Sequence, residues 1–363
     1  MAYFETAYMV RVSAPGRLDF LNTHQDYKGL PVVSIAVNLR AYLTAAEGGG
    51  KCVVSSRNTG DVCEFEVGER PRGRGFCDYM KAAVLAVGAR RCFRGELYSQ
   101  IPIGAGMASS AAILVTAVAA LLKLNGASPS LYDVAELAYV AEREVLGVPC
   151  GRLDQYGSAF GHVSLIYPTP PVKVERLELP GGVFVVLHSG ISHSTAEVHT
   201  KRQEELQRAV ELLKEWLRVE ASGYWDFPWR ALLSHRDVVD QLPEPLRSRV
   251  LFTLKMEKST EEAVAVLKSE MSPLEKLKRV GEVMTQQHWL LSKLYEVSLP
   301  QLDLLVERAL AAGAYGAKLS GAGLGGVVIA LAPDIHTAQR IVKEAEAPSW
   351  WIVEVDRGLE YGD

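Results

Sequence analysis

The stretch Ile101-Pro-Ile-Gly-Ala-Gly-Met-Ala-Ser-Ser-Ala-Ala112 decides the fold and the chemistry of this chain. Its two glycines, Gly104 and Gly106, permit a tight turn in which backbone N–H groups point into one concavity. Ser109 and Ser110 stand where a helix is expected to begin, ahead of a long apolar run. A helix N-terminus offers unpaired N–H donors and a partial positive charge, which suits an anion. The stretch therefore predicts a phosphate loop in a nucleotide-using enzyme, with a plain glycine-rich turn as the alternative.

This loop differs from the two commonest phosphate loops. A Walker loop needs Lys next to Ser or Thr after its last glycine, and that pair is missing. The dinucleotide fingerprint needs a third glycine where Ser109 stands. A second cluster, with glycines at 321, 323 and 326, has the G-x-G-x-x-G spacing, but a strand pattern follows it where the dinucleotide fold requires a helix. This second cluster is either a tight hairpin with glycines at positive φ or a backbone that passes close to a ligand.

Composition excludes several classes of protein. The chain has 363 residues, 48% of them hydrophobic, which is enough for two ordinary domains. Its net charge of −4 and its scattered basic residues argue against a nucleic-acid partner. We find neither a signal-peptide pattern nor an apolar stretch of the roughly 18 residues that a membrane helix needs. The five cysteines are odd in number and form no C-x-x-C pair, so we expect no zinc site, no disulfide framework and a cytoplasmic location.

The pattern of elements predicts an α+β fold in two lobes. The first 70 residues are rich in strand patterns, including a hairpin around Asn58-Thr59-Gly60-Asp61. Helical patterns dominate the second half, and an irregular insert is expected over 225–250. We place the boundary near Pro180-Gly-Gly182, with an N-terminal lobe at 1–180 and a C-terminal lobe at 181–363. The other expected elements are helices at 78–87, 109–124, 131–146, 194–217, 274–295, 302–312 and 336–345, and strands at 10–12, 31–45, 161–179, 315–319, 327–331 and 350–355.

Three segments occur in an order that resembles one enzyme family. They are Ala14-Pro-Gly-Arg-Leu-Asp-Phe-Leu-Asn-Thr-His-Gln-Asp-Tyr27, the loop at 102–112, and Lys318-Leu-Ser-Gly-Ala-Gly-Leu-Gly-Gly326. The chain resembles the GHMP small-molecule kinases, and the galactokinase branch in particular. Two further segments, 141–155 and 189–202 with His193-Ser194, also resemble that branch. The similarity covers nearly the whole chain.

The resemblance implies a two-lobed fold, with an N-terminal lobe like ribosomal protein S5 domain 2 and a C-terminal ferredoxin-like lobe. It also implies a cytoplasmic phosphotransferase that moves the γ-phosphoryl group of Mg-ATP to a sugar hydroxyl, the anomeric one in the galactokinase branch. The expected partners are ATP, Mg²⁺ and a sugar, in a chain that is either a monomer or a homodimer.

The same resemblance assigns roles at the phosphate end. Asp154 is the expected base for the substrate hydroxyl or a group that orients it, and Arg17 offsets charge beside it. Ser110, with Ser109 as a further candidate, and Glu142 are the expected Mg²⁺ ligands; Glu144, two residues on, faces elsewhere and serves as an internal control. Residues expected to contact the nucleotide are Pro102, Gly104, Ala105, Gly106, Met107, Ala108, Ser109, Ser110, Ala111, Gly321 and Gly323, and Phe76–Tyr79 is expected on the adenine side.

The substrate end departs from the family pattern. The expected sugar contacts are Thr23, His24, Asp26, Tyr27, Gly151 and Arg152. Thr23 stands where galactokinases carry a glutamate, and Arg152 replaces an apolar residue. These changes suggest a galactose relative, for example a uronic acid whose carboxylate pairs with Arg152, a pentose or an amino sugar. An Arg152 that pairs with a carboxylate of the protein is the alternative.

Two other functions stay open at this level. One is a different GHMP kinase of the mevalonate type, and the other is a silent sugar sensor on a kinase scaffold. The His-Gln-Asp-Tyr and Leu-Asp-Gln segments speak against the first. The presence of Ser109, Ser110, Asp154 and Arg17 speaks against the second.

Overall fold

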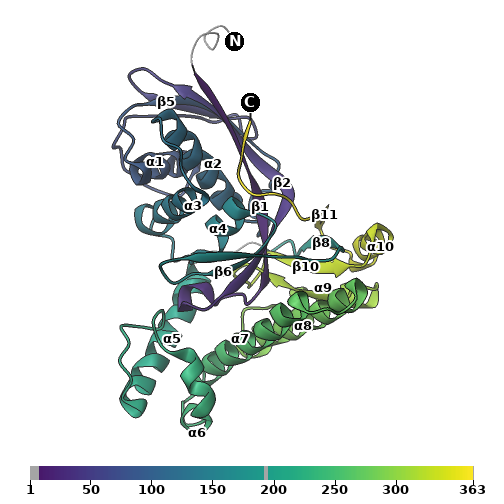
Figure 1. Cartoon of the computed structure of the whole chain (residues 1–363). Helices are drawn as coiled ribbons and strands as arrows, with labels where there is room; N and C mark the ends of the chain where they lie inside the picture. Colours follow the sequence, from purple (N-terminus) through teal and green to yellow (C-terminus); the bar gives the residue numbers. More distant parts are fainter. Residues whose placement is uncertain (1–7, 192–194, 363) are drawn as a thin grey trace. The chain divides into compact units, whose positions relative to one another are not determined.

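The computed structural model describes residues 8–191 and 195–362, and the side chains of residues 195–197 are left aside (Figure 1). The chain forms two compact units. The first consists of Met1–Arg17, Ile35–His162 and Val355–Asp363, and the second of Leu18–Ser34 and Val163–Glu354. The sequence suggests a single boundary near residue 180. The observed units instead divide at four points, because strands β1 and β2 run on from one unit into the other.

A mixed sheet forms the frame of the first unit. Its strand order is β12-β1-β2-β5-β3-β4. The expected hairpin is present, since β3 and β4 pair antiparallel with Val54 opposite Cys63, whereas β3 and β5 pair in parallel. The strands are β1 (Met9–Leu21), β2 (Val32–Glu47), β3 (Cys52–Ser56), β4 (Val62–Phe65), β5 (Phe93–Ser99) and β12 (Glu360–Gly362).

Four helices and one π-helical turn pack together in this unit (Figure 1). They are α1 (Phe76–Val87), α2 (Ser109–Leu124), α3 (Leu131–Val140), the π-turn η2 (Ala141–Val145) and α4 (Leu153–Phe160). Helix α2 begins at Ser109 as expected, and its run of Ala, Val and Leu is buried on nearly every side. Helix α3 begins with a capping box that Ser130 and Asp133 form.

A disulfide joins Cys63 on β4 to Cys77 in the first turn of α1. This bond corrects the expectation that the cysteines form no disulfide framework. An odd cysteine count rules out complete pairing but not a single pair, and the hairpin brings Cys63 under α1. The disulfide also removes one ground for expecting a cytoplasmic location.

One buried cation attaches the segment 355–362 to the first unit. Arg40, which is 6% exposed, binds the Asp356 carboxylate at 2.8 Å and the Gly358 carbonyl at 2.7 Å. Strand β12 then pairs antiparallel with β1, with Glu360 opposite Ser13. The outer edge of β1 is thereby covered by residues about 350 positions away in the sequence.

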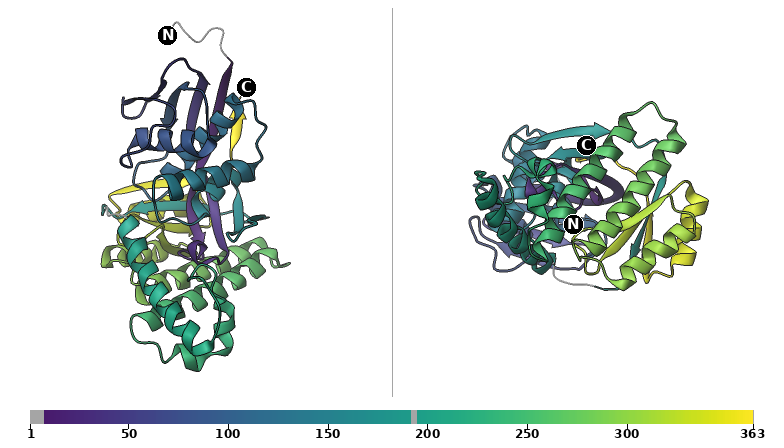
Figure 2. Two further views of the ribbon diagram at one scale, coloured as in Figure 1. Left: turned by 90° about the vertical axis from the view of Figure 1, so that its left-hand side faces the viewer. Right: turned by 90° about the horizontal axis from the view of Figure 1, so that it is seen from below.

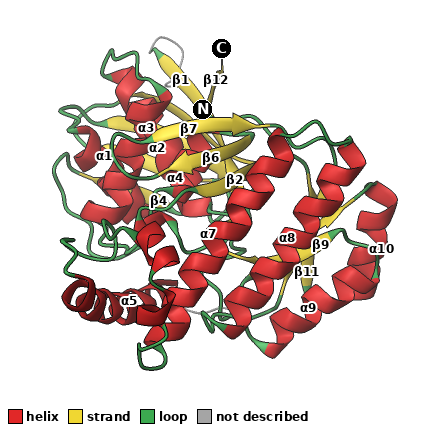
Figure 3. Ribbon diagram, turned by 60° about the horizontal axis from the view of Figure 1, so that its bottom comes forward, coloured by secondary structure: helices red, strands yellow, loops and turns green. Residues whose placement is uncertain are grey.

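The second unit is built on a four-stranded antiparallel sheet in the order β11-β8-β10-β9. Numbered along the chain, this is the 4-1-3-2 order of a ferredoxin-like sheet. Helices α8, α9 and α10 pack against it (Figure 3). The elements are β8 (Val183–His188), α8 (Pro273–Lys293), α9 (Pro300–Ala311), β9 (Gly316–Ser320), β10 (Val327–Ala332), α10 (Ile335–Ala345) and β11 (Ser349–Val353).

Further helical segments of this unit lie between β8 and α8 in the sequence. They are α5 (Thr195–Leu217), the 3-10 turn η3 (Trp229–Ser234), α6 (Arg236–Val239) and α7 (Leu246–Lys268). Helix α7 packs along α8 and α5 (Figure 2). This helix was not predicted, because polar residues interrupt its apolar stripe. The unit also contains the hairpin β6 (Val163–Tyr167) and β7 (Lys173–Leu177). Among the described residues, no helix is long and apolar enough to cross a membrane.

Candidate active site

The loop between β5 and α2 has the backbone that its sequence predicts. Gly104 and Gly106 adopt positive φ angles of 73° and 65°, and Ala108 also has a left-handed conformation at φ 54°. An alanine with positive φ is uncommon and costs free energy, so its place at the N-cap of α2 indicates a constrained turn. The loop thus ends in a helix N-terminus at Ser109, the arrangement that binds anions.

Arg17 joins this loop to the expected base. Its Nε and Nη2 atoms donate to Oδ1 of Asp154 at 2.9 and 2.7 Å, and its Nη1 donates to the Gly106 carbonyl at 2.9 Å. The Arg17 side chain is 6% exposed and that of Asp154 is 28% exposed, so the cation is enclosed while the carboxylate keeps an open side. The close approach requires Gly16, because a Cβ there would lie 2.9 Å from the Met107 carbonyl oxygen.

Asp154 lies in the first turn of helix α4. The next strand along the chain, β6, begins only at Val163. A carboxylate in the first helical turn is stabilised by the helix dipole. The helix therefore fixes the position of Asp154.

Glu142 is the second carboxylate at this end of the unit. It is buried, with 5% of its surface exposed, on the π-turn η2. Ser110 Oγ donates to its Oε1 at 2.9 Å, and Gln155 Nε2 donates to its Oε2 at 2.6 Å. Glu144 is exposed, as expected of the internal control. No role was predicted for Gln155 from the sequence.

The environment of Glu142 favours its protonated form. Burial, followed by the nearby negative charge of Asp154, raises the pKa of Glu142 to about 7. Such a carboxyl group becomes a strong anionic ligand once a cation arrives. A serine hydroxyl and one carboxylate are the hard oxygen donors that Mg²⁺ accepts while it keeps several waters. Ser110 and Glu142 therefore fit a magnesium ion.

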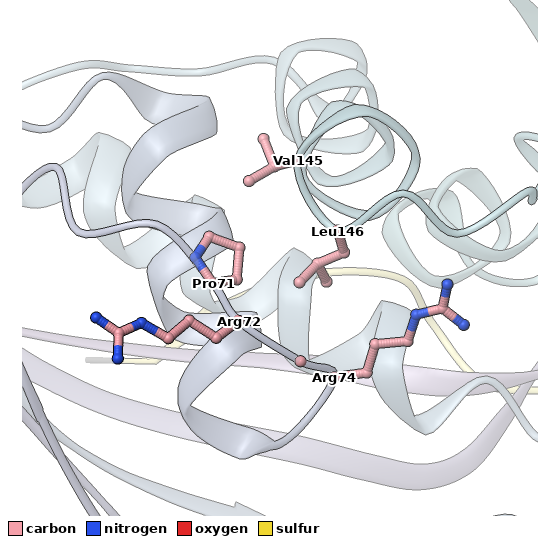
Figure 4. A pocket seen from close by; sticks show the side chains of 6 residues that line it. Pro71, Arg72, Arg74, Val145 and Leu146 are labelled. Atoms are coloured by element: carbon pink, nitrogen blue, oxygen red, sulfur yellow. The ribbon is translucent and has the colours of Figure 1, made fainter.

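A cavity of about 300 Å³ lies at the end of η2, the turn that carries Glu142 (Figure 4). One wall is the segment Pro71, Arg72, Gly73 and Arg74, and the other is Val145 and Leu146 at the end of η2. The adjoining first turn of α1 reaches the loop, because the Tyr79 hydroxyl is hydrogen-bonded to Ser110. The expected adenine-side segment Phe76–Tyr79 thus begins directly after the cavity wall.

The expected sugar contacts of the 22–27 turn belong to the second unit. His24 is buried, and its ring nitrogens lie 3.0 Å from the Tyr27 hydroxyl and 3.0 Å from the Ala322 carbonyl oxygen. Tyr27 is buried and shares a 2.7 Å hydrogen bond with Tyr295, while Asp26 is only partly buried. Both Asn22 and His24 have left-handed backbones, at φ 66° and 67°. The turn is therefore held in one strained conformation by its own unit.

Thr23 is enclosed in a polar cluster of the second unit. Its hydroxyl donates to Asp19 Oδ1 at 3.0 Å and accepts from Lys318 Nζ at 2.6 Å. Lys318 is fully buried and also donates to the Asp19 carbonyl. A short neutral residue at position 23 therefore leaves room for the Lys318 ammonium, which a hydroxyl and a carbonyl solvate.

The second glycine cluster is the turn of the hairpin β9-β10, in which Ser320 lies opposite Val327. Gly321 and Gly323 both have φ 87°. A Cβ on Gly323 would lie 2.1 Å from the Val297 carbonyl oxygen, so the glycine is needed for packing within the unit. The tight-hairpin interpretation thus accounts for this glycine, and a nucleotide contact at Gly321 and Gly323 stays a prediction.

Arg152, which follows Gly151, has a carboxylate partner inside the first unit. Its Nε and Nη2 atoms donate to Glu136 at 3.0 and 2.7 Å, and its guanidinium lies 4.2 Å from the ring centre of Tyr139. The alternative left open by the sequence, an ion pair within the protein, is the geometry observed. His193 and Ser194 lie outside the described residues.

Comparison with known proteins identifies the family of the chain. Residues 78–162 match the GHMP kinases N terminal domain, residues 264–348 match GHMP kinases C terminal, and residues 2–47 match the galactokinase galactose-binding signature. A galactokinase of Roseiflexus sp. is 30% identical over 89% of this chain and 83% of its own length. The chain belongs to the GHMP kinase superfamily, in its galactokinase branch. The galactokinase of Pyrococcus furiosus is similar to it as well, at 29% identity over 89% of this chain and 88% of its own length.

Solved structures of GHMP kinases share the fold of the chain. Lactococcus lactis galactokinase complexed with galactose superposes with a TM-score of 0.83 at 22% identity, covering 99% of this chain and 96% of its own. Methanococcus jannaschii mevalonate kinase gives 0.71 at 18% identity, covering 98% and 100%. The expected two-domain α+β GHMP fold is confirmed. As a galactokinase-like GHMP kinase, the protein is an ATP-dependent sugar kinase that phosphorylates an alcohol group.

Proposed function

We propose that this kinase transfers the γ-phosphoryl group of Mg-ATP to the anomeric hydroxyl of galactose or of a closely related sugar. The observation that carries the proposal is the bridge made by Arg17, which binds both the Asp154 carboxylate and the Gly106 carbonyl of the phosphate loop. One fixed cation thereby holds the base next to the loop. Phosphoryl transfer depends mainly on such positioning and on charge neutralisation.

The site residues of the first unit have separate roles in this reaction. The loop N–H groups and the start of α2 bind the phosphates of ATP. Ser110 and Glu142 hold Mg²⁺, which neutralises charge on the phosphates when it is bound. Arg17 occupies Oδ1 of Asp154, so we assign the proton of the attacking hydroxyl to Oδ2. The adenine ring of ATP enters the cavity between Arg74 and Leu146.

The sugar is held by the family's substrate segment. We assign this role to Thr23, His24, Asp26, Tyr27 and Gly151. The pairing of Arg152 with Glu136 makes a uronic acid the weaker candidate, since that guanidinium already has its carboxylate. Galactose is therefore the first substrate to test, with its pentose and amino-sugar relatives after it.

A sugar panel with ATP and Mg²⁺ tests the proposal. ADP release is measured with galactose, arabinose, N-acetylgalactosamine, galacturonate and mevalonate, and ³¹P NMR identifies the phosphorylated position. We expect the highest kcat/KM for a neutral sugar and a phosphate on its anomeric oxygen. Turnover of mevalonate alone, or phosphate on another hydroxyl, would contradict the proposal.

The variant Asp154→Asn tests the assigned base. We expect turnover to fall by at least 1000-fold while ATP binding is retained, because the amide cannot accept the proton. Near-normal turnover would remove Asp154 from this role. Sugar binding without turnover in the unmodified chain would instead indicate a silent sensor.

A further inference from the structure

The Cys63–Cys77 disulfide closes the segment that forms one wall of the cavity. The two cysteines are 14 positions apart, and the residues between them include Pro71, Arg72 and Arg74 (Figure 4). Cys63 is buried, whereas Cys77 is partly exposed. The covalent bond therefore restricts a wall that otherwise consists of a surface segment with exposed arginines.

Hydrogen bonds carry this restraint to the start of α1. The Asp78 carboxylate, next to Cys77, accepts from the backbone N–H of Arg72 at 2.9 Å and of Gly75 at 3.0 Å. Partial burial acts to raise the pKa of Asp78, but these bonds and one from the Gly73 N–H outweigh it and lower that pKa. The ionised carboxylate thus ties the cavity wall to the same helical turn that the disulfide anchors.

That helical turn also contacts the metal-binding residues. Tyr79 follows Asp78 and is hydrogen-bonded through its hydroxyl to Ser110, which in turn binds Glu142. The opposite wall, Val145 and Leu146, ends the element that carries Glu142. Arg74 joins the two walls, because its Nη2 donates to the Gly147 carbonyl at 3.3 Å. The disulfide, the cavity and the Ser110–Glu142 pair therefore form one connected set of contacts.

We propose that the Cys63–Cys77 disulfide is a positioning element of the nucleotide site, so that the affinity for ATP depends on its oxidation state. This inference rests on the proposed function. A dithiol reductant attacks the sulfur of the partly exposed Cys77, the S–S bond breaks, and both cysteines become thiols while the reductant forms its own disulfide. Two electrons and two protons pass to the protein.

Reduction should weaken ATP binding because it increases the conformational freedom of the cavity wall, and not because it removes contacts between the protein and ATP. Opening the cross-link lets residues 64–76 sample more conformations, and only a fraction of them shape the cavity wall. The apparent Kd then rises by the inverse of that fraction. The residues assigned to the sugar lie outside this segment, so the KM for the sugar should not change.

The test compares the oxidised and the dithiothreitol-reduced protein. We expect the KM for ATP, and the calorimetric Kd for Mg-ATP, to rise about three- to tenfold on reduction and to recover on reoxidation, whereas kcat and the sugar KM stay within twofold. Non-reducing peptide mapping should show the Cys63–Cys77 link in the oxidised sample. Absence of that link, or an unchanged KM for ATP, would overturn the inference.

Two double variants provide matched controls. Cys63→Ser with Cys77→Ser should have the higher KM for ATP at the outset and should not respond to reductant. Cys52→Ala with Cys92→Ala removes two free, buried thiols that interact with each other, Cys52 on β3 and Cys92 just before β5, and should keep the wild-type response. Loss of the response in this control would overturn the inference. If the serine variant does not fold, the reduction and reoxidation cycle of the unmodified protein decides. An oxidised protein that phosphorylates no sugar would instead refute the proposed function.

Discussion

Ser110 donates a 2.9 Å hydrogen bond to Glu142, which joins the first turn of α2 to a π-turn that begins 31 residues later. Neither group alone distinguishes a kinase, since serines at helix starts and glutamates on helices are common. Their contact places a hydroxyl and a buried carboxylate together at the end of the phosphate loop. This arrangement leads to the first two predictions.

Replacing Glu142 with Gln should remove most metal-dependent nucleotide binding. The amide is a weaker ligand for Mg²⁺ than a carboxylate and cannot neutralise the cation. We expect the Kd for Mg-ATP to rise at least tenfold and turnover to fall at least 100-fold, as measured by calorimetry and ADP release. Glu144→Gln is the matched control, because this exposed residue lies on the same π-turn. Equal effects in both variants would refute the assignment.

The raised pKa of Glu142, about 7, predicts a pH dependence of metal binding. Mg²⁺ binds the ionised carboxylate, so affinity for Mg-ATP should rise between pH 6 and 8 by several-fold. This rise should vanish in Glu142→Gln. A pH profile of Kd that is the same in both proteins would show that another group titrates.

The same pKa predicts how stability changes with pH. Because the folded state holds the Glu142 proton up to about pH 7 and the unfolded state releases it near pH 4.5, the free energy of unfolding decreases as pH rises through this window. The full difference is about 3 kcal/mol. In nucleotide-free protein, Glu142→Gln should therefore gain Tm relative to the unmodified protein at pH 8 and not at pH 4. Calorimetric scans at both pH values check the sign.

Arg17→Lys should impair catalysis with little loss of fold. A lysine can reach only one of the two acceptors, Asp154 or the Gly106 carbonyl, because it lacks the planar fork of three donors. We expect kcat to fall about 100-fold, comparable to the loss of one fixed donor to a transition state. Rapid single-turnover kinetics separates this effect from ATP binding. A kcat within fivefold of normal would mean that the fork is not needed.

Two glycines of the β9-β10 turn should differ in their tolerance of alanine. Gly323 and Gly326 both have positive φ, so each substitution incurs backbone strain of about 1 kcal/mol. Only Gly323→Ala adds a clash, with the Val297 carbonyl oxygen at 2.1 Å, whereas the space around Gly326 is open. Gly323→Ala should lower Tm by several degrees more than Gly326→Ala. Equal losses in thermal scans would refute the packing argument.

Arg152→Gln should lower stability by about 1 kcal/mol, in line with a partly exposed ion pair, without changing sugar preference. The ratio of kcat/KM for galactose to that for galacturonate should stay within threefold. A selective loss of galacturonate turnover would show that Arg152 contacts the substrate carboxylate after all.

Local patterns predicted most of the elements that position the site. Glycines 104 and 106, followed by two serines and an apolar run, were sufficient to locate the loop and the first residue of α2. Helix α4 was not found, because Leu153–Phe160 is too short for a helical period to emerge from its sequence. Helix α7 was not found because polar residues interrupt its apolar face.

Contacts between distant residues were beyond sequence reasoning. The Cys63–Cys77 pair depends on how the β3-β4 hairpin packs against α1, and the Glu136 partner of Arg152 depends on the angle between α3 and α4. The role of Gln155 was missed for the same reason, because it depends on the hydrogen bond to the buried carboxylate of Glu142. In each case the residue types were visible, but the partner was not.

The attachment of residues 355–362 to β1 has a consequence for biosynthesis. Glu360, the neighbour of Ser13, is translated only after some 350 further residues. Until then Arg40 lacks its Asp356 and Gly358 partners and the outer edge of β1 is uncovered. The nascent polypeptide must therefore pass through a stage with an open sheet margin, at which unpaired backbone groups can pair with other strands.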